Sequence, residues 1–206
     1  RNTRRWQAEL QRFFLKLVPV QPNQPPNLPS ASVPLYRDVL RIGSNPSLLP
    51  YTLYKLGTHH VERATELRSD KEYEGLYGSK VEKNRLAALE RVHADSAKGY
   101  FSRMMAEYPA DTTNVPAALS VLGNYYLVAG GQSNRDTAAV YMSALVRDHW
   151  YYSQYRHALR VLAEISWWNG KGEVRDPVKR NRLYSDALAY LAWAARELDA
   201  TEADQI

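Results

Sequence analysis

The feature that most constrains the fold is a pattern of apolar and small residues that recurs at helical spacing. Residues three or four positions apart share one face of a helix. The clearest occurrence consists of Leu119, Leu122, Gly123 and Tyr126, then Gly130, and after it Thr137, Tyr141, Ala144 and Leu145. The first group predicts a helix ended by Gly130, and the second predicts another helix. We therefore expect a helical hairpin in which Gly123 leaves room for a close helix crossing.

The same pattern occurs elsewhere in the chain. A later copy contains Leu159, Leu162, Ala163 and Gly170, followed by Tyr184, Ala187 and Leu188. An earlier copy contains Leu53, Leu56 and Gly57, followed by Ala97, Phe101, Met104, Met105 and Pro109, and a half copy before it contains Tyr36, Val39 and Leu40. Residues 65–89 fit no copy, and we expect 83–108 to lengthen a helix. The pattern predicts an all-α protein with a helical repeat domain at 35–200 and a tail at 201–206.

The spacing of the copies resembles that of a known repeat family. Leu122 and Leu162 are 40 residues apart, more than the roughly 34 of a plain tetratricopeptide repeat. The turn at 169–177 has the sequence Asn-Gly-Lys-Gly-Glu-Val-Arg-Asp-Pro. These features resemble the Sel-one-like members of the tetratricopeptide family, although Val174 is only approximately spaced and Arg180 replaces a small residue. The resemblance implies antiparallel helix hairpins stacked in a right-handed solenoid that binds other proteins.

The basic charge of the chain is concentrated in an N-terminal arm. The net charge is +5 overall, and residues 1–18 carry five cationic side chains against Glu9, whereas the remainder is nearly neutral. Helical spacing in 1–18 would place its large apolar residues on one face, and six prolines follow between 19 and 34. We expect 1–34 to be an extended arm that contacts a partner through Arg4, Arg5, Trp6, Arg12, Phe13 and Phe14.

Aromatic residues are bunched in the second half of the chain. Trp150, Tyr151 and Tyr152 precede one predicted helix, and Trp167 and Trp168 lie within it. A helix buries only part of its circumference, so these rings either line a partner-binding groove or fill core gaps left by small residues. The partner-binding residues predicted on the inner helices are Tyr125, Tyr126, Gln154 and Tyr155.

No motif of the chain predicts catalysis. The absence of cysteine excludes thiolate metal sites and cysteine nucleophiles. His59 and His60 are adjacent, and His149 and His157 are eight apart, so neither pair has the spacing of a helical zinc site. The glycines at 130–131 and 170–172 are expected to end helices, because a phosphate loop would need a preceding strand. We expect no catalytic residue, metal, cofactor or small-molecule substrate.

A motif near the start of the repeats has two interpretations. Leu35, Tyr36 and Arg37 resemble the motif of small mitochondrial LYR adaptors, which engage an acylated carrier protein. However, Tyr36 also aligns with Tyr141 and Tyr184 as a core tyrosine of the repeat. The alignment favours the core role.

These observations favour a soluble, non-catalytic scaffold or accessory subunit of a larger assembly. The basic arm and a sequence that starts at Arg1 suit a processed or partial mitochondrial protein. The apolar runs are too short to predict a membrane span. Alternatives are a free peptide-binding adaptor, an RNA-associated subunit that uses the arm, and an enzyme whose site is not visible in sequence spacing. Residues 1–18 are also candidates for contact with a membrane surface.

Overall fold

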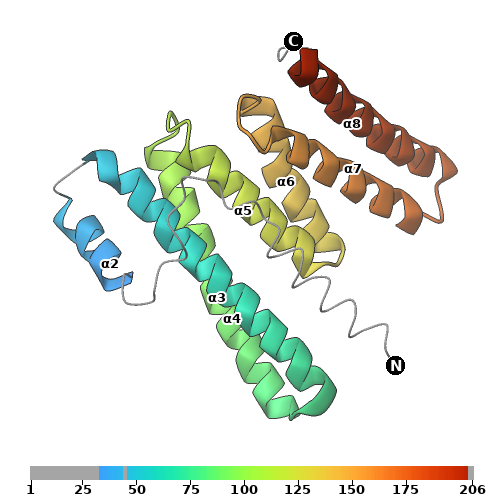
Figure 1. Cartoon of the computed structure of the whole chain (residues 1–206). Helices are drawn as coiled ribbons and strands as arrows, with labels where there is room; N and C mark the ends of the chain where they lie inside the picture. Colours follow the sequence, from blue (N-terminus) through green and yellow to red (C-terminus); the bar gives the residue numbers. More distant parts are fainter. Residues whose placement is uncertain (1–32, 44–45, 204–206) are drawn as a thin grey trace. The chain divides into compact units, whose positions relative to one another are not determined.

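The computed structural model describes residues 33–43 and 46–203, and every regular element within them is helical. The elements are α2 (Val33–Ile42), the short 3-10 helix η2 (Pro46–Leu48), α3 (Leu49–Tyr77), α4 (Lys80–Glu107), α5 (Asn114–Ala129), α6 (Gln132–Asp148), α7 (Tyr155–Gly172) and α8 (Pro177–Ala203). Figure 1 shows them as consecutive coiled ribbons. The prediction of an all-α protein is confirmed.

The chain divides into two compact units, Arg1–Leu35 and Tyr36–Ile206. The first unit lies almost entirely outside the described residues. The predicted contacts of the arm, at Arg4, Arg5, Trp6, Arg12, Phe13 and Phe14, therefore fall on residues that the structure does not describe. The second unit contains all of the predicted hairpins.

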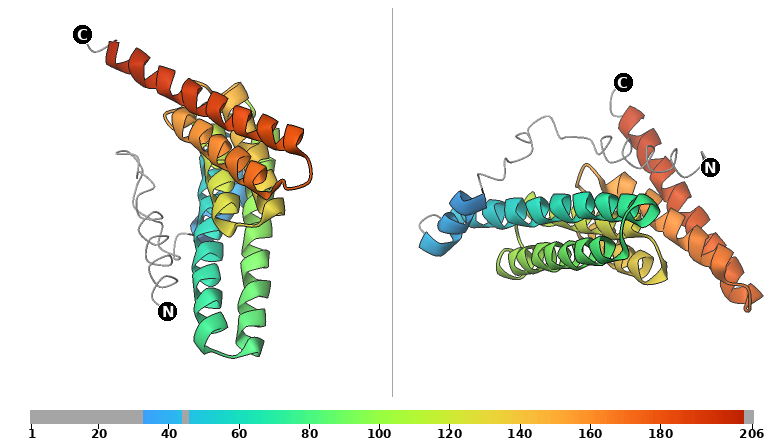
Figure 2. Two further views of the ribbon diagram at one scale, coloured as in Figure 1. Left: turned by 90° about the vertical axis from the view of Figure 1, so that its right-hand side faces the viewer. Right: turned by 90° about the horizontal axis from the view of Figure 1, so that it is seen from below.

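The helices of the second unit pair into hairpins. Helix α3 packs along α4, α5 along α6, and α7 along α8, and the partners lie side by side in the views of Figures 1 and 2. Helix α5 also packs on α3 and α4, while α7 packs on α6. Each hairpin therefore contacts the next one along the chain.

The unmatched segment 65–89 forms the distal half of the first hairpin. It lengthens both partners, because α3 runs on to Tyr77 and α4 begins at Lys80. Ser79 precedes α4, and its hydroxyl accepts a hydrogen bond of 3.1 Å from the backbone N–H of Glu82, which caps the helix. Residues 83–107 lengthen α4, as we expected for 83–108, and the segment also lengthens α3, which we did not expect.

A glycine in the first helix of each hairpin receives a large side chain from the second helix. A Cβ added at Gly57 would lie 2.4 Å from Phe101, one at Gly123 would lie 2.6 Å from Met142, and one at Gly170 would lie 2.8 Å from Tyr184. A residue with a Cβ at any of these positions would force the facing side chain to shift. The three contacts show that the hairpins are built in the same way.

This register corrects two details of the sequence alignment. The glycines at 170–172 were expected to end a helix, and α7 does end at Gly172, but Gly170 lies in its last turn and is buried against Tyr184. Tyr184 was aligned with Tyr141, yet its contact with glycine places it in the role of Met142. Gly130, in contrast, does end α5, with a φ of 68°.

One apolar core runs through the three hairpins. It includes residues from every helix between α3 and α8. The largest completely buried apolar side chains are Leu53, Leu56, Phe101, Met104, Leu122, Met142, Leu145 and Leu159. Burial of side chains of this size stabilises the fold by roughly 1.5–3 kcal/mol each, so the hairpins depend on one another for stability.

Candidate partner-binding surface

The predicted inner-helix residues are more buried than partner contacts usually are. Tyr125 and Tyr155 are buried, and Tyr126 and Gln154 are half-buried. The ring of Tyr125 packs edge-on against that of Tyr126, with centroids 5.2 Å apart, and the ring of Tyr155 lies 6.0 Å from that of Trp193. These four residues mainly join helices within the domain, so little of their surface is left for a partner.

An ion-pair network holds the first hairpin to α5. The Nε of Arg68 donates to Glu90 at 2.7 Å, and the ammonium group of Lys71 binds the other oxygen of the same carboxylate. Arg68 also donates to the backbone oxygen of Tyr125 at 3.3 Å, and its guanidinium carbon lies 4.4 Å from the centre of the Tyr125 ring. The side chains of Arg68 and Glu90 are largely buried, so these bonds are weakly screened by solvent.

Polar contacts also join α5 to the start of α7. The hydroxyl of Ser120 donates to the side chain of Gln154, and His157 Nε2 donates to Asn124 Oδ1 at 2.9 Å. Burial, followed by the positive charge of Arg160, lowers the pKa of His157. The hydrogen bond to Asn124 thus gives His157 a partner within the domain.

A pair of histidines lies between α3 and α4. His60 Nδ1 is 2.9 Å from His93 Nδ1, and the His60 ring stacks on Tyr100 with centroids 5.6 Å apart. Burial, followed by the charges of His93 and His59, lowers the pKa of His60 to about 4. A hydrogen bond between the two Nδ1 atoms requires a proton on one of them and a lone pair on the other, which a neutral pair of rings provides. If both rings were protonated, both Nδ1 atoms would be donors and the hydrogen bond would be lost. No spacing pattern in the sequence predicts His93 as the partner of His60, because the two are 33 residues apart.

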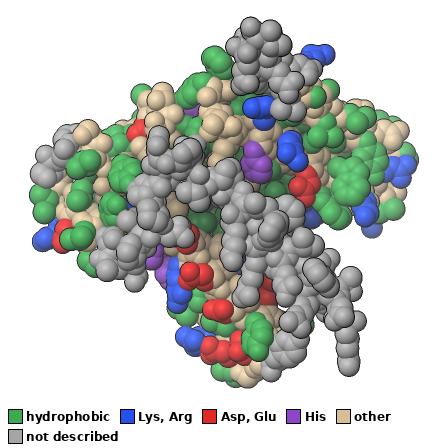
Figure 3. Space-filling view, in the orientation of Figure 1, with side chains coloured by type: hydrophobic (Ala, Val, Ile, Leu, Met, Phe, Trp, Pro, Cys, Tyr) green, Lys and Arg blue, Asp and Glu red, His purple; other side chains and the backbone are tan. Residues whose placement is uncertain are grey.

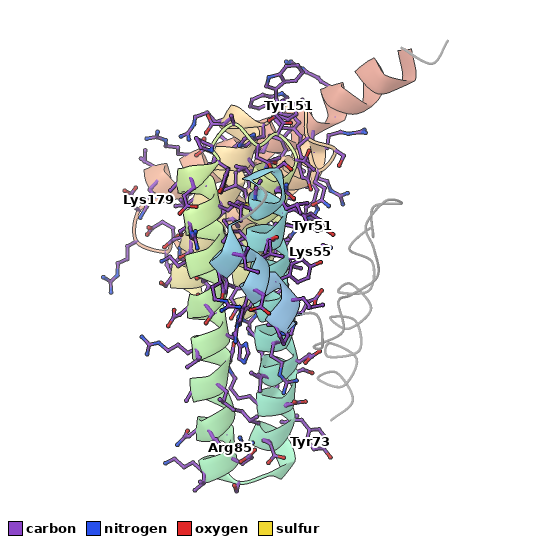
Figure 4. All side chains as sticks on the ribbon, turned by 90° about the vertical axis from the view of Figure 1, so that its left-hand side faces the viewer. Tyr51, Lys55, Tyr73, Arg85, Tyr151 and Lys179 are labelled. Carbon is purple, nitrogen blue, oxygen red and sulfur yellow. The ribbon has the colours of Figure 1, made fainter. Side chains whose placement is uncertain are left out.

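A lysine is buried near the start of α3. The Lys55 side chain is buried, and its Nζ lies 5.4 Å from the centre of the Tyr51 ring, which is labelled beside it in Figure 4. The same Nζ lies 5.9 Å from the centre of the Tyr54 ring. Burial lowers its pKa, and the charge of Glu62 partly opposes this. The contacts are those of a cation held by aromatic faces, which stabilises the helix locally.

All four tryptophans in the described part of the chain are exposed at the surface. Trp150 is 72% exposed, Trp167 45%, Trp168 40% and Trp193 45%. Tryptophan is usually well buried in folded domains, and it is enriched at protein interfaces. Of the bunched aromatic residues, Trp150, Trp167 and Trp168 thus lie at the surface, whereas Tyr152 and Tyr155 pack with the core.

The final helix also exposes apolar side chains. Leu188 and Leu191 of α8 are 68% and 48% exposed, whereas Leu145 of α6 is completely buried. Helix α6 is covered by both α5 and α7, whereas α8 packs mainly on α7 among the described helices. Hydrophobic side chains (green) are plentiful in Figure 3 where Figure 1 places α7 and α8.

The described residues show neither a metal cluster nor a membrane-spanning helix. Within 33–43 and 46–203, no three His, Asp or Glu side chains are arranged to hold a metal ion. No helix in the same ranges combines the length and the hydropathy required to cross a bilayer. Comparison of the chain with models of protein families, with characterised proteins and with solved structures found no match in any of the three.

Proposed function

We propose that this chain is a non-catalytic scaffold or accessory subunit that binds partner proteins in a larger assembly. The observation that carries the proposal is the exposure of every described tryptophan on α7, on α8 and on the segment before α7. Large amphipathic rings contribute most of their binding energy when a partner removes them from water. An isolated domain gains nothing from keeping these rings solvated.

The arrangement of the hairpins supports the same proposal. Three hairpins, each closed by a glycine contact and each packed on the next, are what a Sel-one-like or tetratricopeptide-like array requires. In the proposed architecture they stack as a right-handed solenoid, and the exposed leucines of α8 extend the partner-binding surface. The solenoid geometry and the class of function are implied by the resemblance to these repeat families.

The proposed role of the arm rests on its charge and amphipathic pattern. Residues 1–18 would lie along a neighbouring subunit, and their cationic side chains suit an acidic surface. A mitochondrial complex is the setting that this basic segment favours in our proposal. The free peptide-binding adaptor and the RNA-associated subunit are outcomes that the experiment below distinguishes.

Capture of partners by the full-length chain tests the proposal. The tagged chain is cross-linked in its native source to the proteins that bind it, and the captured proteins are digested and identified. The set of captured proteins is then compared with the sets captured by the double variant Trp150→Ser/Trp193→Ser and by a version lacking residues 1–34. A matched control is Val81→Ser/Val92→Ser, which removes exposed apolar side chains from α4.

The scaffold proposal predicts stoichiometric protein partners that are lost with the tryptophans and with the arm but retained by the valine control. Weak peptide clients that are indifferent to the arm would favour the adaptor. Partners that disappear on nuclease treatment would favour the RNA-associated subunit. Either of these results would overturn the proposal.

A further inference from the structure

One face of α7 carries a line of charged and aromatic side chains. Arg156, Arg160, Glu164, Trp167 and Lys171 follow each other at intervals of three or four residues, so they share one side of the helix over about 22 Å. All are exposed except Arg156, which is half-buried. We call these five residues the α7 stripe.

The cations of the α7 stripe form no ion pair with the described side chains of the domain. No carboxylate in the described part of the chain forms an ion pair with Arg156, Arg160 or Lys171. The Nζ of Lys171 instead lies 5.2 Å from the centre of the Trp167 ring and 5.0 Å from that of Trp168. The stripe therefore has three cations and a single carboxylate, Glu164.

The spacing of the two arginines matches a helical partner. Arg156 and Arg160 are one turn apart, about 6 Å along the axis, which equals the separation of two carboxylates at positions i and i+4 of another helix. A guanidinium binds a carboxylate through two parallel N–H donors. The exposed rings of Trp167 and Trp168, two turns further on, offer apolar area next to the charges.

A nucleic acid fits this surface less well. Glu164 lies between Arg160 and Trp167, where a continuous phosphate backbone would meet a negative charge. Lys171 already occupies a position over both indole rings, which limits the stacking of bases on them. The order of positive and negative side chains along α7 instead matches a protein helix whose charges follow the complementary order.

We propose that the α7 stripe docks an acidic amphipathic helix of a partner protein. Two carboxylates of that helix, one turn apart, bind Arg156 and Arg160, a cationic residue lies opposite Glu164, and an apolar side chain packs on Trp167 and Trp168. This inference rests on the proposed function, because it names the chemistry of one partner of the scaffold.

A peptide-binding experiment with the full-length chain tests the inference. The probe is a fluorescein-labelled 18-residue helical peptide of Glu, Leu, Ala and one Lys, with the order of charges given above. A second probe has the charges inverted, and a third is an oligouridine RNA. Anisotropy is measured for the wild type, for Arg156→Glu/Arg160→Glu, and for the control Lys80→Glu/Arg91→Glu, which makes the same change of charge on α4.

We expect the acidic peptide to bind the wild type and the control, and the α7 variant to bind it at least about tenfold more weakly. The α7 variant should gain affinity for the inverted peptide. Equal binding of the acidic peptide by all three proteins, or no binding by the wild type, would overturn the inference. Tighter binding of RNA than of the peptide, lost in the α7 variant, would assign the stripe to nucleic acid instead.

The partner capture described above separates the two proposals. If protein partners are recovered equally with the wild type and with Arg156→Glu/Arg160→Glu, the scaffold stands and the α7 stripe inference fails. If the acidic peptide binds as expected but no partner is captured, the affinity of the α7 stripe for an acidic helix is established and the scaffold proposal fails.

Discussion

Two glycines in the first hairpin should respond in opposite ways to the same substitution. At Gly57, an added Cβ would lie 2.4 to 2.7 Å from three ring atoms of Phe101. Phe101 is completely buried and packs against Tyr54, so its ring has little room to move. At Gly99, also in a helix, an added Cβ meets nothing within 4 Å.

The magnitudes follow from these contacts. Replacing a helical glycine with alanine stabilises a helix by about 1 kcal/mol, which is all that Gly99→Ala should do. Gly57→Ala stabilises its helix by the same amount, but the added methyl group overpacks the ring of Phe101, which costs roughly 3 kcal/mol of stability. We expect a net loss of about 2 kcal/mol, and therefore a fall in Tm of about 4–8 °C, against a rise of about 2–4 °C for Gly99→Ala.

Thermal and urea unfolding followed by circular dichroism at 222 nm measures both variants. The double variant Gly57→Ala/Phe101→Leu should recover part of the loss, because the smaller side chain relieves the contact. If Gly57→Ala and Gly99→Ala change the stability in the same direction, the close approach of α3 and α4 at Phe101 is refuted.

Two further predictions concern buried polar groups. Glu90→Gln should lower the free energy of unfolding by about 3 kcal/mol, because Arg68 and Lys71 lose their shared carboxylate, and restored stability in Arg68→Met/Glu90→Leu would show that the effect is electrostatic. Stability should also fall by on the order of 2 kcal/mol between about pH 6.5 and pH 4, because the unfolded chain takes up a proton in this range and His60, whose pKa is about 4, does not. Urea unfolding across this pH range should show a shallower loss for His60→Gln, and an equal loss would remove His60 from the explanation.

Local patterns in the sequence predicted much of the fold. The three- and four-residue spacing of Leu119, Leu122 and Tyr126 located α5, and Gly130 marked its end. The sequence also contains a signal for the start of α4. Ser79 and Glu82 have the Ser-x-x-Glu spacing of a capping box, and the hydroxyl of Ser79 accepts from the backbone N–H of Glu82, so this spacing marks the start of α4.

Other features depend on tertiary contacts that spacing does not contain. Gly170 lies in a Gly-Lys-Gly sequence that favours a turn, but packing against Tyr184 keeps it in the helix. The pairing of His60 with His93 joins residues that are far apart in the sequence. The burial of Tyr125 likewise depends on its packing against a neighbouring hairpin, so a surface role was predicted for a residue that lies mostly inside.

The assembly state of the native protein tests the central claim most directly. Native mass spectrometry of the chain, isolated from its source at low salt, measures the mass of whatever contains it. The scaffold account predicts a defined species much heavier than the 23.6 kDa of the chain, with other proteins present in fixed ratios. A single species of 23.6 kDa with no bound protein would contradict the account.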